Sequence, residues 1–133
     1  MQITNDGGKT WTNKAPEVWK TGIPKGTWVS SIEISKLNPK RIYASFDNHM
    51  YGDHQTYIAM SVDACNTWKR IVSTEFSGFA HVVREDLQNE NLLFVGTETG
   101  LFISLDAGKT FMRSKYQGMP WFNLVRDLKI HPK

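Results

Sequence analysis

Alternating apolar and polar positions along residues 28–34 mark the first regular part of the chain. In an extended conformation one side carries Trp28, Ser30, Ile32 and Ile34, and the other carries Val29, Ser31 and Glu33. This period of two predicts a β-strand. We expect Trp28 to pack inside a sheet, because in this register it shares a face with Ile32 and Ile34.

The same kind of segment recurs along the chain, separated by polar turns. Three further strands are predicted at 41–46, 56–62 and 68–72. A second set of four is predicted at 79–85, 92–97, 100–104 and 110–114. A last strand is expected at 124–130. Residues 14–27 contain Pro and Gly and predict a loop. No segment keeps an apolar 3.6-residue period for three turns, so no helix is expected.

One octet occurs three times, at 4–11, 61–68 and 104–111. It reads hydroxyl, any residue, Asp, small residue, Gly, polar residue, Thr, aromatic. An Asp at the start of a tight turn accepts hydrogen bonds from following backbone N–H groups, and Gly supplies a positive φ. The aromatic offers apolar area to a layer beneath. A self-capped hairpin turn is therefore predicted, with a structural role for Asp6, Gly8, Thr10, Trp11, Asp63, Thr67, Trp68, Asp106, Gly108, Thr110 and Phe111.

The second octet departs from the pattern, because Cys65 stands where the other two copies have Gly. A non-Gly residue at positive φ costs on the order of 1 kcal/mol. We expect Asn66 to take the left-handed position instead. The second turn would then be the weakest of the three.

The octet resembles the Asp-box, or BNR repeat, which occurs in sialidases, in other β-propeller glycoside hydrolases and in sortilin-type receptor propellers. Segments such as Trp28–Ile32, Ala44–His49, Leu92–Gly100 and Val125–Pro132 are similar to a bacterial subgroup described as glycosyl hydrolase-like or sortilin-N-terminal-like. The resemblance implies that the octets lie on the turn between the third and fourth strands of a blade, away from the ligand-binding face. It supplies no catalytic residue for this sequence.

The Asp residues of the octets are 57 and then 43 residues apart, which is near the spacing that propeller blades give. The predicted fold is all-β, with two complete four-stranded antiparallel blades of an incomplete β-propeller. The expected divisions are a partial blade at 1–27, blades at 28–75 and 76–117, and the start of another at 118–133. Closed propellers typically have about 4–8 blades. We therefore expect the chain to be a fragment whose partners are the remaining blades.

Composition narrows the function classes only slightly. The net charge of +3 is spread over the 133 residues without a basic stripe, so no nucleic-acid partner is predicted. No apolar run approaches the ~20 residues of a membrane helix, and no signal-segment pattern is recognised at residue 1 of this sequence. The single Cys65 excludes an internal disulfide. The compartment stays open, although the resemblance implies a secreted or periplasmic protein.

The loop at 47–55 is the richest candidate for chemistry, because loops on a rigid scaffold often carry function. It links the second and third strands of the first complete blade, and its candidate ligand-contacting residues are Asp47, His49, Asp53 and His54. Their spacing matches no metal-binding motif, so neither a metal nor a cofactor is predicted. The alternative interpretation is a solvated loop in which these side chains cap turns.

Hydrolysis of a glycoside would need two carboxylates about 5–10 Å apart. Asp47, Asp53, Glu85, Asp86 and Glu98 are available, but the sequence pairs none of them. The five arginines form no recognisable carboxylate-binding triad. Exposed Trp19, Trp28 or Trp121 could stack on a sugar.

The resemblance therefore implies structural and binding blades of an Asp-box propeller that binds a glycan or a protein. The alternative is part of a sialidase-like or xyloglucanase-like glycoside hydrolase, so enzymatic activity stays open. A convergent carboxylate pair on the face opposite the octets would favour the hydrolase. The absence of such a pair, with a broad apolar or aromatic face there, would favour binding.

Overall fold

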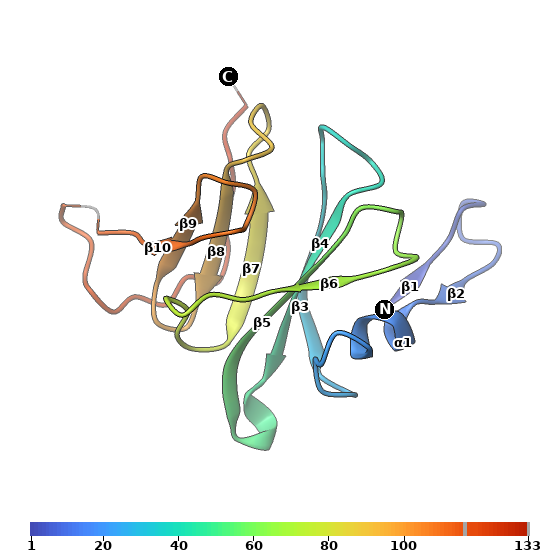
Figure 1. Ribbon diagram of the computed structural model, residues 1–133, viewed down its shortest axis with the longest axis horizontal. Helices are drawn as coiled ribbons and strands as arrows, with labels where there is room; N and C mark the ends of the chain where they lie inside the picture. The colour runs from blue at the N-terminus through green and yellow to red at the C-terminus, as the bar shows by residue number, and fades with distance from the viewer. Residues whose placement is uncertain (116, 133) are drawn as a thin grey trace.

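The computed structural model describes residues 1–115 and 117–132, and nearly all of their regular structure is β-strand (Figure 1). One sheet contains β3 (Trp28–Ile34), β4 (Ile42–Asn48), β5 (Asp53–Ser61) and β6 (Lys69–Ile71). Another contains β7 (Ala80–Glu85), β8 (Leu93–Thr97), β9 (Leu101–Ser104) and β10 (Met112–Arg113). A small hairpin pairs β1 (Gln2–Ile3) with β2 (Thr12–Asn13).

Each four-stranded sheet is an antiparallel meander in chain order, β3-β4-β5-β6 and β7-β8-β9-β10. The two sheets face each other, as Figure 1 shows. The predicted all-β fold of four-stranded propeller blades is confirmed. Residues 116 and 133, which belong to the predicted divisions 76–117 and 118–133, lie outside the described residues.

Both blades have a bulge at the same point of their first strand pair. The register shifts between Val29 and Ser31 in one blade and between Ala80 and Val82 in the other. A bulge places one extra residue in a strand and changes which face the residues before it occupy. The prediction that Trp28 shares a face with Ile32 and Ile34 is therefore wrong, since the extra residue lies between them.

The pairing between β3 and β4 shows on which face of the sheet each β3 side chain lies. Ile32 pairs with Ala44, whereas Trp28 pairs with Asp47 on the other face of the sheet. Trp28 is 71% exposed, so the expectation that it packs inside the blade is also wrong. It is the first residue of β3 and lies beside Asp47, where the 47–55 loop begins. Ile32 and Ile34 are exposed as well.

The core lies between the two sheets. The largest cluster combines Tyr43, Ile58 and Ile71 of the first blade with the second-blade residues Ala80, Val83, Leu93, Val95, Phe102 and Phe111. A second cluster lies on the opposite face of the first blade, where Ala44, Phe46, Tyr57 and Ala59 meet Val18 and Ile23 of the N-terminal segment. The first blade is therefore packed on both faces.

Hydroxyl groups add polar contacts between the sheets. Ser30 Oγ donates to the backbone carbonyl of Ala80 (2.8 Å), and Ser31 Oγ accepts from the backbone N–H of Val83 (3.2 Å). Both hydroxyls also lie 2.8 Å from Ser45 Oγ. The bulge brings Ser30 and Ser31 to the same partner, so the irregular part of β3 helps to fix one blade on the other.

A buried carboxylate joins the blades at their other end. Glu85 Oε1 accepts from Arg41 Nη1 (2.8 Å) and from the Tyr43 hydroxyl (3.1 Å). Arg41 Nη2 also pairs with exposed Glu90 (2.7 Å). Burial and the adjacent Glu85 carboxylate raise the pKa of Tyr43 well above its usual value. Arg41 and Tyr43 of the first blade thus bind a carboxylate of the second blade.

Two segments differ from the sequence predictions. Residues expected to form a loop contain the short helix α1 (Ala15–Trp19), which has Pro16 in its first turn and buries Val18. Pro is favourable there because it lacks the N–H that a first turn leaves unpaired. The predicted strand at 124–130 is not formed among the described residues. Instead, the backbone N–H of Val125 donates to Thr97 (2.9 Å), close against Gly96.

Each octet forms a turn closed by its own side chains, and the third copy illustrates the arrangement. Ser104 Oγ donates to Asp106 Oδ1 (2.8 Å) and accepts from the backbone N–H of Gly108 (2.8 Å). Asp106 then accepts from the backbone N–H (2.9 Å) and the hydroxyl (2.6 Å) of Thr110. The Asp106 carboxylate therefore accepts hydrogen bonds across the turn that a backbone carbonyl would otherwise accept.

The first and second octets repeat these contacts. The copies differ at the Gly position and in the burial of the closing aromatic residue. Cys65 itself adopts a left-handed conformation (φ 67°), so the expectation that Asn66 would do so is wrong. Ala64 before it is left-handed too (φ 57°), and the Cys65 side chain is buried. The closing Trp11 is 58% exposed, whereas Phe111 is buried, so the aromatic covers a core only in some copies.

These turns predict a dependence of stability on acid. Hydrogen bonds, first from the Thr of each octet, lower the pKa of Asp6, Asp63 and Asp106 from 3.8 to about 2. A depressed pKa contributes stability above the unfolded value that is lost as pH falls through the folded value. We expect the thermal unfolding midpoint to fall between about pH 4 and pH 2. The Asp63→Asn variant should show a shallower fall, and an identical slope in that variant would contradict this origin.

Candidate functional site

The two blades present three connecting segments at the end opposite the octet turns. They are the β4–β5 loop at 47–55, the link between the blades at 73–79 and the β8–β9 turn at 97–100, here together called the loop end. The β4–β5 loop contains the 3₁₀ helix η1 (His49–Tyr51), which ends at Gly52 in a left-handed conformation (φ 73°). Because each strand runs from one end to the other, the loop end and the octets are separated by the length of the sheet.

Asp47 and His49 form a closely bonded pair in the β4–β5 loop. The two carboxylate oxygens of Asp47 lie 2.6 and 2.7 Å from His49 Nδ1. Asp47 Oδ1 also accepts from the backbone N–H of His49 (2.9 Å). On its other side the His49 ring stacks on Phe79 from the link between the blades, with the ring centroids 4.6 Å apart.

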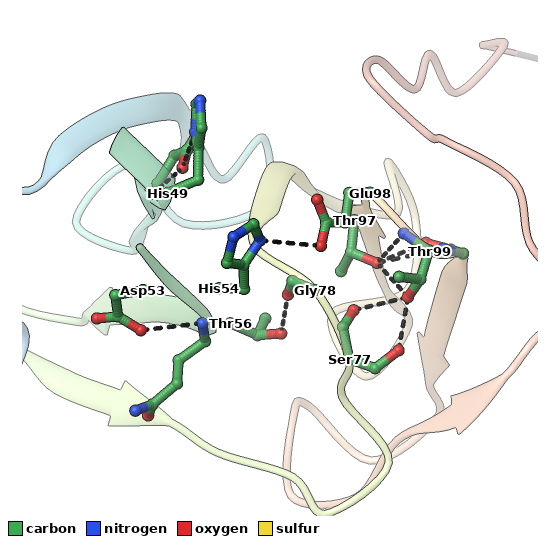
Figure 2. Close-up of polar contacts among 12 residues, drawn as sticks. His49, Asp53, His54, Thr56, Ser77, Gly78, Thr97, Glu98 and Thr99 are labelled. Carbon is green, nitrogen blue, oxygen red and sulfur yellow. Dashed lines mark hydrogen bonds and ion pairs between the residues drawn. The ribbon is translucent and has the colours of Figure 1, made fainter. Parts of the chain in front are cut away.

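His54 and Glu98 connect the loop ends of the two blades. Figure 2 shows the His54 side chain pointing from β5 toward the Glu98 carboxylate, and Nδ1 lies 3.3 Å from Oε1. Thr56 Oγ1 next to it donates to the backbone carbonyl of Gly78. The β4–β5 loop is therefore held against the following link and the β8–β9 turn.

The hydrogen-bond donors to the Asp53 carboxylate all belong to the first blade. It accepts from Asn48 Nδ2 (3.0 Å), from the Tyr57 hydroxyl (2.7 Å) and from the backbone N–H of Gln55 (3.1 Å). Burial acts to raise the pKa of Asp53, but these hydrogen bonds outweigh it and lower the pKa below its usual value. Asp53 therefore fixes the start of β5.

Phe79 and His81 belong to the loop end, although no pattern in the sequence marks them as site residues. Phe79 is contacted by three imidazole rings, at centroid distances of 4.6 Å for His49, 5.8 Å for His54 and 4.9 Å for His81. Burial lowers the pKa of His81, and its buried Nε2 has no hydrogen-bond partner among the described residues. Only the fold brings this histidine to the other two.

A groove lies beside the Asp47–His49 pair. It has a volume of about 260 Å³ and is lined by Gly26, Trp28, Asp47, His49, Met50 and Tyr51. Trp28 (71%) and Tyr51 (80%) are both strongly exposed. The groove therefore combines exposed aromatic groups with one polar pair, the usual composition of a small-molecule site.

The other tryptophans selected from the sequence lie elsewhere. Trp19 packs edge-on against Phe46 in the N-terminal core cluster, at a centroid distance of 6.2 Å. Trp121 is exposed, and the Arg113 guanidinium lies 5.3 Å from its ring centroid. Trp28 is therefore the selected tryptophan that lines the groove.

The five carboxylates considered for hydrolysis do not gather at one place. Asp47, Asp53 and Glu98 lie at the loop end, whereas Glu85 is buried between the blades at the octet end. Asp86 caps the β7–β8 turn, where its Oδ1 accepts from the backbone N–H groups of Gln88 and Asn89 (both 2.9 Å). Three of the five candidates therefore remain at the loop end, each engaged by a neighbouring side chain.

No group of three or more His, Cys, Asp or Glu side chains among the described residues is arranged to hold a metal ion. No helix in this part of the chain is long and apolar enough to cross a membrane.

Known proteins provide a comparison for this arrangement. No protein-family model and no curated protein matches the sequence. Among solved structures, an ancestral GH74 enzyme matches 85% of this chain with a TM-score of 0.66 and 17% identity. The GH74 enzyme of Niastella koreensis matches 68% with a TM-score of 0.56 and 23% identity. GH74 enzymes are β-propeller glycoside hydrolases.

The fold is that of β-propeller blades. The chain spans about 15% of the length of each of these two enzymes, so the likeness concerns a small part of a larger structure. In the propeller blades described above, the octet turns and the aromatic groove occupy opposite ends.

Proposed function

We propose that these blades belong to a carbohydrate-binding β-propeller and contact the carbohydrate through the groove at the loop end. The observation that carries the proposal is the exposure of Trp28 and Tyr51 on one groove of about 260 Å³, beside the polar Asp47–His49 pair. Aromatic rings offer large, rigid apolar surfaces, and a few polar groups orient a ligand between them. A sugar ring has both an apolar face and peripheral hydroxyl groups, so it fits this composition.

The GH74 structural neighbours support a carbohydrate ligand and also motivate a second candidate, a glycoside hydrolase. Hydrolysis would require a carboxylic acid that stays protonated, which burial achieves by raising a carboxyl pKa. Asp53 is tuned in the opposite direction, because its pKa is lowered by hydrogen bonds. Asp47 and Glu98 each face an imidazole nitrogen. Binding is therefore the function that these residues favour.

The proposal includes further blades as partners of this chain. Ile32 and Ile34 expose apolar side chains on the face of β3 that points away from the second sheet. The opposite face of the same blade is covered by β7–β10. A further propeller blade would cover Ile32 and Ile34 in a corresponding way. A glycan- or protein-binding role for the complete protein remains compatible with that assembly.

The binding proposal predicts a specific loss of affinity. We expect the 133-residue chain to bind neutral oligosaccharides, tested as cello-oligosaccharides and xyloglucan oligosaccharides by isothermal titration calorimetry. Trp28→Ala and Tyr51→Ala should each weaken binding about tenfold, which corresponds to about 1.4 kcal/mol. Each substitution removes one apolar wall of the groove and leaves the sheets intact.

Trp11→Ala is the matched control, because Trp11 is also an exposed tryptophan but lies in an octet turn. It should bind with unchanged affinity. Release of reducing sugar from the same ligands would favour the hydrolase instead. Equal affinity in all three variants would contradict the groove as the binding site.

A further inference from the structure

The His49 imidazole is held in one orientation by two different elements. Asp47 binds Nδ1 from within the loop, and Phe79 packs against one face of the ring. A ring restrained at one nitrogen and one face cannot turn freely. Figure 2 shows the His49 ring pointing away from the His54–Glu98 contact. His49 lines the groove together with Trp28 and Tyr51, and Nε2 is the ring nitrogen that Asp47 leaves free.

The Asp47 carboxylate also determines which nitrogen carries the proton. An ionised carboxylate only accepts hydrogen bonds, so the nitrogen facing it at 2.6–2.7 Å must donate. In a neutral imidazole the other nitrogen is then an acceptor. His49 Nε2 makes no hydrogen bond within the described residues, and the side chain is 47% exposed. When the ring is neutral, the groove thus contains an oriented acceptor without a protein donor.

We propose that Asp47 fixes His49 as a hydrogen-bond acceptor that recognises one hydroxyl group of a sugar ring lying in the groove. This deepens the proposed function, and it rests on that function for the choice of a sugar as ligand. His49 is the specificity-determining contact, and Asp47 is a positioning residue that acts through it. The ligand class is a neutral sugar with a free hydroxyl at the ring edge that faces His49, because a sugar lacking that group leaves Nε2 unpaired.

The test pairs protein variants with deoxy sugars. The probes are the oligosaccharide that binds best in calorimetry and a set of analogues, each lacking one hydroxyl. In the wild-type chain one analogue should bind about tenfold more weakly than its parent. His49→Phe keeps an aromatic ring against Phe79 but removes the acceptor, so in this variant the two ligands should bind equally. His81→Phe is the matched control, because His81 also contacts Phe79 but does not line the groove.

A spectroscopic readout separates the positioning role of Asp47 from a structural one. The nitrogen chemical shifts of His49 in the full chain should report a proton on Nδ1 in the wild type. They should report a mixture of tautomers in Asp47→Asn, with a smaller penalty for the deoxy analogue. A shared preference for every analogue in wild type and His49→Phe would overturn the inference. Persistent loss of binding in Trp28→Ala would then leave the proposed function standing.

Discussion

Replacing Glu85 with alanine should lower the free energy of unfolding by about 3 kcal/mol, which is typical for breaking a buried ion pair. The side chain of Glu85 is 1% exposed and lies between the two blades. Its carboxylate binds Arg41 Nη1 and the Tyr43 hydroxyl, both from the first blade. Removal of Glu85 leaves the Tyr43 hydroxyl buried without its acceptor and leaves Arg41 with one carboxylate instead of two.

Glu90→Ala is the control that separates the effect of a buried ion pair from that of an exposed one. Glu90 binds the same guanidinium at 2.7 Å, but its side chain is 56% exposed. An exposed ion pair contributes about 0–1 kcal/mol, because water solvates both charges well. Urea unfolding at 25 °C, followed by tryptophan fluorescence, measures both variants. A loss below 1 kcal/mol for Glu85→Ala, or equal losses in the two variants, would show that the buried contact does not hold the blades together.

The order and type of the strands in the two four-stranded sheets could be predicted because they follow from local patterns. Alternation along β3 to β6 and turn residues between the strands appear directly in the sequence. The bulge at Ser30 could not be predicted, because it depends on how Ser30 and Ser31 contact Ser45 and the second sheet. That single extra residue moves Trp28 from the expected blade interior to the groove. The helix α1 was missed because a five-residue segment is too short to show a helical period.

The sequence points to the candidate site only where the contacts between its residues are local. The loop at 47–55 stands out by its polar composition, and Asp47 and His49 are two residues apart, so their contact is local. Phe79 comes from the link between the blades and His81 from the next blade, and neither carries a signal of its own in the sequence. Their position depends on the packing of one sheet against the other. The sequence likewise did not reveal which carboxylates reach the loop end. Glu85 and Asp86 lie far from it, at the octet end of the second blade.

Phe102 in β9 packs against the link that carries Phe79 into the loop end. Phe102 is fully buried, and its ring meets Phe76 at a centroid distance of 5.5 Å in an edge-to-face arrangement. Phe76 belongs to the link between the blades, and it also packs against Phe111 (4.7 Å) at the end of the third octet. The aromatic group that closes this octet is therefore in direct contact with the link that leads to Phe79.

Phe102→Ala should accordingly lower the free energy of unfolding by about 3–5 kcal/mol, through lost burial and the cavity left behind. Met112→Ala, on the neighbouring β10, is the control, because Met112 is 55% exposed and its truncation leaves no cavity. The variant should also loosen the link carrying Phe79, and hydrogen exchange of the backbone amides at 76–81 measures this. If Phe102→Ala lost stability without faster exchange there, the core would stabilise the blade but would not position the loop end.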